Sequence, residues 1–277
     1  MAIALALGSS LVWGCADFLG GIFSRRRPLA AVTWVSQGAG FAALAALVAA
    51  SGLDIDGRAV GLGLRGGIGG GVGLALFYRA LAVGTMSIVS PLVACGALVP
   101  FVLALATGDR PGLIVLGGAI VALAGAVLAS AEEHRSEVPG RRRAALLAVA
   151  AAFALGVFAY FLGKAGQEGH SLAALFGARI GSLSFLTIWV LATRSSVRLE
   201  RGAIPAIAGL GLLDTAANGL FVLASARGYL SIVSVLGSLY PVATILAAHL
   251  FLGERISRIQ RAGVAVTLAG IALVASG

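Results

Sequence analysis

Charged residues are scarce in this sequence, and their scarcity excludes an ordinary soluble domain. Only 11% of the 277 residues are Asp, Glu, Lys or Arg, whereas 59% are hydrophobic. A soluble domain carries about 25% charged residues, and it keeps a substantial polar surface even when it is large. We therefore expect most of this chain to be surrounded by lipid.

The sequence also lacks the common motifs of energy coupling and catalysis. It has no GxxxxGK[ST] phosphate loop, which excludes an ATP-driven pump within this chain, and no HExxH or His/Cys cluster for a metal. Its two cysteines, Cys15 and Cys95, lie inside apolar runs and indicate no disulfide framework. His249 has no evident nucleophile partner. We therefore expect no enzyme, no cofactor and no metal site.

Apolar runs of about 20 residues, separated by short polar turns, fill the chain instead. A helix of that length crosses the hydrocarbon layer and satisfies its own backbone hydrogen bonds. The runs lack the strict alternation of a transmembrane β-barrel. The sequence therefore predicts an all-α integral membrane protein with ten transmembrane helices. The predicted segments are residues 3–23, 29–50, 59–81, 86–107, 111–130, 144–163, 171–193, 203–224, 231–252 and 257–275.

An internal repeat organises these segments. The residues Ser-Ile-Val-Ser begin at Ser87 and again at Ser231, and each copy opens an apolar run. Upstream, FYRALAVGTM from Phe77 aligns with FVLASARGYL from Phe221, with Phe, Ala and Gly in register. Self-similarity of this kind fixes the architecture, and a unit of about half the chain is too long for a solenoid repeat.

A polar segment, AEEHRSEVPGRRR at residues 131–143, separates the two units. We predict a five-helix repeat at residues 1–130, a connecting loop at 131–143 and a second five-helix repeat at 144–277. Because five is odd, the second unit enters the membrane in the opposite orientation. Such inverted repeats are typical of secondary transporters, whose halves exchange conformations around a central site.

The net charge of +9 reflects membrane topology, not nucleic-acid binding, because the basic residues lie at the ends of the apolar runs. We therefore expect the lipid bilayer, and no nucleic acid, as a partner. One set of alternate turns holds Arg25, Arg26, Arg27, Arg79, Arg135, Arg141, Arg142, Arg143, Arg194, Arg198, Arg201, Arg255, Arg258 and Arg261. The opposite set holds Arg58, Arg110, Lys164 and Arg227. The positive-inside rule places the first set in the cytoplasm and both termini outside.

Several short motifs resemble those of one transporter family. They are Trp13-Gly14, the FYRAL box at Phe77–Leu81, SLYP at Ser238–Pro241, Gly253-Glu254-Arg255, and Gly263 with Ala269-Gly270. Both halves are similar to EamA domains of the drug/metabolite transporter superfamily. The resemblance implies ten helices, a central cavity and transport of small metabolites or drugs. It also implies cytoplasmic termini, so the charge count and the resemblance leave two orientations open.

The two halves depart from that pattern in different ways. The first half has Gly-Asp-Arg at Gly108–Arg110 in place of Gly-Glu-Arg. An arginine that such domains often carry in their second helix is present in the second half as Arg179, whereas the first half has Ser36-Gln37. The halves are therefore not chemically equivalent.

Charges at membrane depth are costly, and each is a functional candidate. Four charged residues fall inside predicted segments: Asp17, Arg65, Arg179 and Asp214. The structural alternative is that they form buried ion pairs that hold the bundle together. Arg65 lies near a segment end, from which its side chain can reach the interface.

Polar and aromatic neighbours extend this set. Trp13 lies four residues before Asp17 on one helix face, an arrangement that suits an organic cation, or else a tryptophan of the interface belt. Asn218 lies four residues after Asp214 and adds an amide, or else an interhelical hydrogen bond. The predicted substrate-binding residues are Trp13, Asp17, Gln37, Arg179, Asp214 and Asn218.

The segment GLGLRGGIGGGVG, Gly61–Gly73, carries glycines at four-residue spacing. Small residues at this spacing let helix backbones approach closely in membranes. No strand is predicted before it, so a dinucleotide site is excluded. We expect this helix to pack against its neighbours at short distance.

Together these features predict a secondary transporter of small organic metabolites or drugs that works by alternating access. A pair of opposite charges in one cavity suits a zwitterion such as an amino acid, and a buried Asp17 or Asp214 could couple transport to protons. The alternatives are an intramembrane enzyme acting on a lipid-like substrate and a non-transporting membrane scaffold. The predominance of Arg over Lys indicates a GC-rich bacterial genome, so we expect the cytoplasmic membrane of a bacterium.

Overall fold

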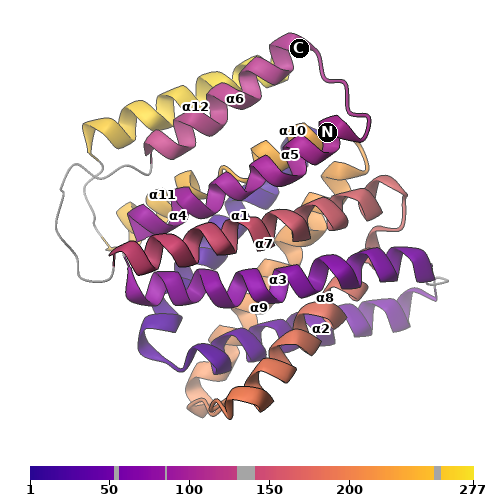
Figure 1. Cartoon of the computed structure of the whole chain (residues 1–277), viewed down its shortest axis with the longest axis vertical. Helices are drawn as coiled ribbons and strands as arrows, with labels where there is room; N and C mark the ends of the chain where they lie inside the picture. The colour runs from indigo at the N-terminus through magenta and orange to yellow at the C-terminus, as the bar shows by residue number, and fades with distance from the viewer. Residues whose placement is uncertain (53–55, 85, 130–140, 253–256) are drawn as a thin grey trace.

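The computed structural model describes residues 1–52, 56–84, 86–129, 141–252 and 257–277, and these residues form helices joined by turns (Figure 1). The elements are α1 (Ala2–Arg26), α2 (Leu29–Ser51), α3 (Gly57–Val83), α4 (Met86–Ala94), η1 (Cys95–Ala97), α5 (Leu98–Ala106), α6 (Leu113–Ala129), α7 (Arg141–Gln167), α8 (Ser171–Thr193), η2 (Arg201–Ala203), α9 (Ile204–Ser225), α10 (Leu230–Gly237), α11 (Tyr240–Leu252) and α12 (Arg258–Ser276).

Seven of the described helices are long and apolar enough to cross a membrane: α1, α2, α3, α7, α8, α9 with η2, and α12. Three shorter apolar helical stretches accompany them, at Leu92–Ala106, Leu113–Ala129 and Leu230–Thr244. The predicted all-helical, multi-pass membrane fold is therefore confirmed. The count of ten spans in two repeats stays a prediction.

The glycine-rich helix α3 packs tightly against α8, as its sequence predicts. A Cβ atom added at Gly63 would lie 2.1 Å from the backbone oxygen of Ala174, and one added at Gly67 would lie 2.0 Å from that of Ala178. Helix α9 meets α2 in the same way, because a Cβ at Gly211 would lie 1.8 Å from the Ser36 oxygen. Real Cβ atoms do not come this close, so these positions require glycine.

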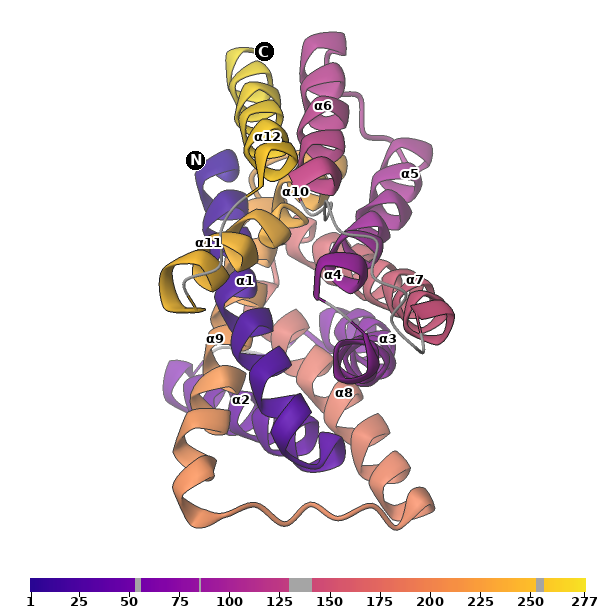
Figure 2. The same ribbon diagram turned by 90° about the vertical axis from the view of Figure 1, so that its left-hand side faces the viewer.

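Helices α6 and α12 form a separate pair at one edge of the molecule, side by side in both Figure 1 and Figure 2. Their interface also depends on small residues. Added Cβ atoms would fall within 2.9 Å of backbone atoms of the partner helix at Gly118, Gly125, Gly263 and Gly270. Without side chains between them, the two backbones gain van der Waals contact, which drives helix association in lipid.

Two of the predicted segments are broken in the middle. The segment 86–107 divides into α4, η1 and α5, and the segment 231–252 divides at Ser238–Leu239 between α10 and α11. Each break lies two to five residues before a proline, Pro100 or Pro241. A proline lacks the N–H that would bond to the carbonyl four residues earlier, so the helix opens there.

A buried carboxylate connects the end of the first copy of the repeated motif with the start of the second copy. Asp109, in the turn between α5 and α6, is 7% exposed. One of its oxygens accepts hydrogen bonds from the Ser231 backbone N–H at 2.8 Å and from the Ser231 hydroxyl at 2.9 Å. The turn that ends the first copy of the motif therefore caps the helix α10 that opens the second copy.

Substitution of two glycines of α3 tests this packing, because the two changes in stability should differ. Gly67→Ala should destabilise the protein by about 1–3 kcal/mol, because the new methyl group would separate α3 from α8. At Gly61 a Cβ would meet no atom within 4 Å. Gly61→Ala should leave stability unchanged or raise it by up to about 1 kcal/mol through helix propensity. Thermal unfolding in detergent measures both variants, and an equal shift for the two would refute the close contact.

Candidate functional site

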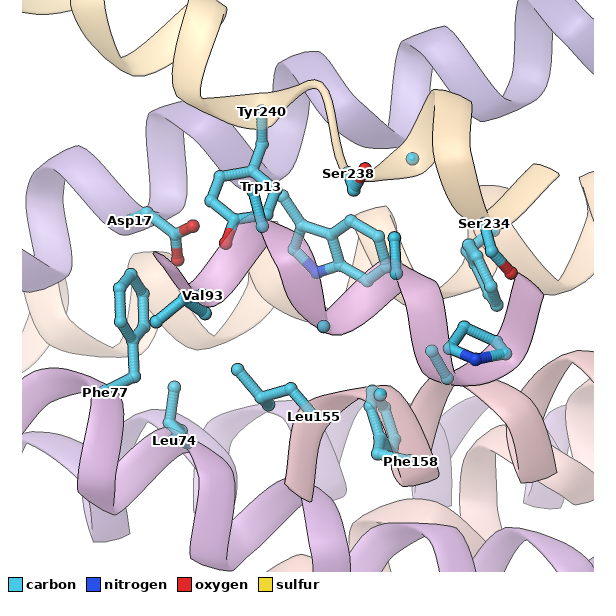
Figure 3. Close-up of a pocket in the computed structure, with 18 of the residues that line it drawn as sticks. Trp13, Asp17, Leu74, Phe77, Val93, Leu155, Phe158, Ser234, Ser238 and Tyr240 are labelled. Atoms are coloured by element: carbon cyan, nitrogen blue, oxygen red, sulfur yellow. The ribbon is translucent and has the colours of Figure 1, made fainter. Parts of the chain in front are cut away.

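A cavity of about 110 Å³ lies in the middle of the bundle, against both helix breaks (Figure 3). Helices α1, α3, α7, α9, α10 and α11 contribute to its wall, together with α4, η1 and α5. Five aromatic rings and two carboxylates line it: Trp13, Phe77, Phe158, Phe221, Tyr240, Asp17 and Asp214. The wall is therefore mostly apolar with a few acidic groups, a composition typical of a small-molecule site.

The aromatic wall is packed, and it contains one buried polar atom without a described partner. The rings of Trp13 and Phe221 lie 5.5 Å apart between centroids, tilted by 44°. The Tyr240 hydroxyl is buried and has no hydrogen-bond partner among the described residues. Figure 3 shows the Asp17 carboxylate beside the Tyr240 ring, at the end of the cavity that Phe77 closes. The two groups are near enough to interact electrostatically.

A second, smaller cavity of about 40 Å³ holds the polar residues. At its wall, Arg179 from α8 donates a hydrogen bond to Asp214 Oδ2 of α9 at 2.7 Å and another to Gln37 Oε1 of α2. The Gln37 amide donates to the same Asp214 oxygen at 3.2 Å, and the Ser182 hydroxyl donates to Gln37 Oε1 at 2.8 Å. The Arg179 side chain is 7% exposed and that of Asp214 is 20% exposed. These four residues form one hydrogen-bonded network across three helices.

Asn218 lies at the edge of this network. Its side-chain amide donates to the backbone oxygen of Asp214 at 2.6 Å. Its side-chain oxygen is buried and has no hydrogen-bond partner among the described residues. A buried, unpaired acceptor costs free energy unless a ligand or water satisfies it. Asn218 therefore offers one free acceptor to the smaller cavity.

Asp214 connects the two cavities, since its side chain lines both. Its carboxylate and that of Asp17 are near enough to repel each other. The structure gives Asp214 a cationic partner in Arg179 but gives Asp17 no hydrogen bond or ion pair with any described residue. The walls of the two cavities together therefore contain two carboxylates and one guanidinium, an excess of one negative charge when both acids are ionised.

The structure brings all six predicted site residues to these two cavities. Trp13, Asp17 and Asp214 line the larger one, and Gln37, Arg179, Asp214 and Asn218 line the smaller one. Their role in binding a substrate stays a prediction. Arg65, by contrast, is exposed and lines neither cavity. Glu254 lies outside the described residues.

Sequence reasoning missed the phenylalanines of the cavity wall. Phe77 and Phe221 head the two aligned motifs of the repeat, and both side chains are almost fully buried against the cavity. Their matched positions in the two halves were the signal that could have identified them. Phe158 carries no such signal, because it is one of several aromatic residues in an apolar helix.

Comparisons with known proteins agree with this architecture. The model of the EamA-like transporter family matches residues 142–276. This match supports an EamA-domain membrane transporter of the drug/metabolite transporter superfamily. A solved structure, titled only "Crystal structure of protein", superposes with a TM-score of 0.80 at 18% sequence identity, over 99% of this chain and 98% of that one. At this identity the likeness shows the fold alone. No curated protein matches the chain.

The Arg179–Asp214 pair can be tested by removing one or both charges. Arg179→Gln should destabilise the protein by about 3–5 kcal/mol, because it leaves the Asp214 carboxylate without a cation in a low-dielectric site. The double variant Arg179→Gln/Asp214→Asn should recover at least about 1 kcal/mol of that loss. Thermal unfolding of the single and double variants measures the coupling. Arg65→Gln, an exposed arginine on α3, serves as the control. A double variant as unstable as the sum of the single variants would contradict the pairing.

Proposed function

We propose that this protein is a secondary transporter that moves small organic cations, as metabolites or drugs, across the bacterial cytoplasmic membrane by alternating access. The match of residues 142–276 to the EamA-like transporter family supports the general class of membrane transporter. The observation that carries the finer proposal is the Asp17 carboxylate, which lies without a described ionic partner in a cavity walled by aromatic rings. A carboxylate beside aromatic faces attracts an organic ammonium group.

The packing of the helices supports the proposed pair of inverted repeats, residues 1–130 and 144–277 joined through 131–143. In this scheme α1 corresponds to α7, α2 to α8, α3 to α9, and α6 to α12. If each helix is replaced by its counterpart in the other repeat, the contact between α3 and α7 becomes the contact between α9 and α1. Both contacts are present and extensive. The same replacement converts the contact between α3 and α8 into that between α9 and α2, which are both present. Packing of this kind is expected from a pseudo-two-fold axis in the membrane plane.

The environment of Arg179 favours a cation over a zwitterion. An amino-acid substrate would need a free guanidinium for its carboxylate. The Arg179 guanidinium already bonds to Asp214 and Gln37, so a substrate carboxylate would have to displace the Asp214 carboxylate. An ammonium group, in contrast, can approach Asp17 without breaking any described bond, and the Tyr240 hydroxyl beside it can accept a further hydrogen bond.

The same carboxylate provides a mechanism for proton coupling. Asp17 can carry a proton or hold a substrate cation, but not both at once, because each neutralises the same charge. If the cavity opens alternately to the two sides, a proton released on one side is replaced by a cation bound there, and the exchange drives transport in opposite directions. Asp214 is less suited to this role, since Arg179 already compensates its charge. We therefore assign proton exchange to Asp17.

Transport in proteoliposomes tests the assignment. Phenyltrimethylammonium, a permanent cation that crosses lipid poorly, should enter vesicles that contain the wild-type protein when their interior is acidic. Asp17→Asn should abolish the response to the pH gradient and weaken binding by at least about tenfold, which corresponds to about 1.4 kcal/mol. Glu200→Gln removes a carboxylate whose side chain is 88% exposed, and it should behave as the wild type.

Other outcomes separate the alternatives. Asp17→Asn protein that keeps the wild-type pH dependence would refute coupling through this residue. Transport of phenylalanine without transport of the cation would favour the zwitterion. Stable protein that transports no small molecule would favour the scaffold, and turnover of an added lipid substrate would favour the enzyme.

A further inference from the structure

A groove on the outside of the bundle, separate from the two central cavities, has the form of a lipid site. It has a volume of about 450 Å³, and it is lined by residues near the ends of α3 and α8 and at the start of α2. Its lining residues are Pro28, Leu29, Ala30, Val72, Ala75, Leu76, Arg79, Phe185, Trp189, Ser195 and Ser196. None of them lines either central cavity.

The groove changes from apolar to polar along its length. Val72 and Phe185 lie at the deeper end, and Arg79 lies two helical turns further along α3, about 10 Å away at ~1.5 Å per residue. Trp189 follows Phe185 by one turn of α8, near the helix end, where tryptophan is typical of the membrane interface. The groove therefore offers apolar residues at one end and a cation at the other. This arrangement is complementary to a phospholipid, which has an apolar acyl chain and a phosphate headgroup.

The Arg79 guanidinium is free to bind an anion. Its side chain is exposed, and the structure gives it no hydrogen bond or ion pair with the described residues. Other arginines nearby are engaged: Arg25 donates to the Leu81 oxygen at 3.3 Å, and Arg27 lies 3.8 Å from Glu200. No acidic residue lines the groove. The mouth of the groove is therefore complementary to negative charge.

The end of α8 brings two hydroxyls to the same mouth. Arg194 adopts the left-handed conformation, with φ of 50°, and the Ser195 N–H donates back to the Val190 oxygen at 3.1 Å. This is the hydrogen bond of a Schellman motif, which ends the helix and turns the chain. The turn places Ser195 and Ser196 in the groove wall with Arg79.

We propose that this groove binds one anionic phospholipid, with the headgroup phosphate at Arg79 and an acyl chain along α3 and α8 towards Val72. Guanidinium and phosphate form charge-assisted hydrogen bonds in a fixed geometry. Basic pockets between helices at the membrane surface are suited to anionic headgroups. The proposal does not depend on the transport mechanism, because the groove is independent of the central cavities.

Native mass spectrometry of the full-length protein, released from detergent with added lipid, tests the site. Phosphatidylglycerol and phosphatidylcholine with the same acyl chains are compared. The wild type should bind the first phosphatidylglycerol about tenfold more tightly than phosphatidylcholine. Arg79→Gln should remove this preference and keep phosphatidylcholine binding, which also reports that the variant is folded. Ala75→Phe fills the groove and should weaken binding of both lipids.

The control is Arg258→Gln, which removes an exposed arginine at the start of α12 that does not line the groove. It should bind both lipids as the wild type does. Equal affinity of the wild type for the two lipids, or an equal loss in Arg79→Gln and Arg258→Gln, would overturn the proposal. Displacement of phosphatidylglycerol by inorganic phosphate at equal concentration would also overturn it, because the site would then recognise a free anion.

Discussion

The cost of placing a guanidinium inside a membrane bundle determines how the site is built. A buried charge is tolerated only if its partner is close and its remaining hydrogen bonds are satisfied. Arg179 on α8 meets both conditions, through Asp214 on α9 and Gln37 on α2. This network joins three helices, and within it the negative charge of Asp214 is compensated by Arg179. Asp17 is consequently the carboxylate that the described structure leaves uncompensated at the aromatic cavity.

Small residues make that network geometrically possible. The missing side chain at Gly211 lets α9 lie against the backbone of Ser36, next to Gln37 on α2. At Gly40 an added Cβ would lie 2.3 Å from the Thr215 hydroxyl oxygen and 3.2 Å from Arg179 Nε, so the glycine also leaves room for the guanidinium. Side chains as short as Asp214 and Gln37 can reach Arg179 only because the helix backbones are this close. Close packing and charge compensation are therefore one property of the fold.

The helices and the polar residues of the site could be predicted from the sequence for physical reasons. The pairing of the charges and the helix breaks could not, because the sequence signals for them are weaker. Long apolar runs demand helices in lipid, and charges within them are rare enough that Asp17, Arg179 and Asp214 stood out. Which aspartate pairs with Arg179 depends on the distances between helices. The hydrophobic periodicity of the sequence gives no information about these distances. The helix breaks at Cys95–Ala97 and Ser238–Leu239 could be predicted from the sequence only through the prolines that follow them. The free guanidinium of Arg79 had none, because an arginine at a helix end is ordinary.

The contact between Asp109 and Ser231 bears on the proposed alternating access to the cavity. Helix α10 carries Ser234 and Gly237 of the cavity wall, and Ser238 follows at its break from α11. Any movement of α10 away from the turn between α5 and α6 must break two hydrogen bonds to one buried carboxylate. Hydrogen bonds to a charged group contribute about 1.5–3 kcal/mol each. In the proposed transport cycle, that energy is small enough for substrate binding to offset, so the start of α10 would be a point where the occupied cavity biases the conformation of the bundle.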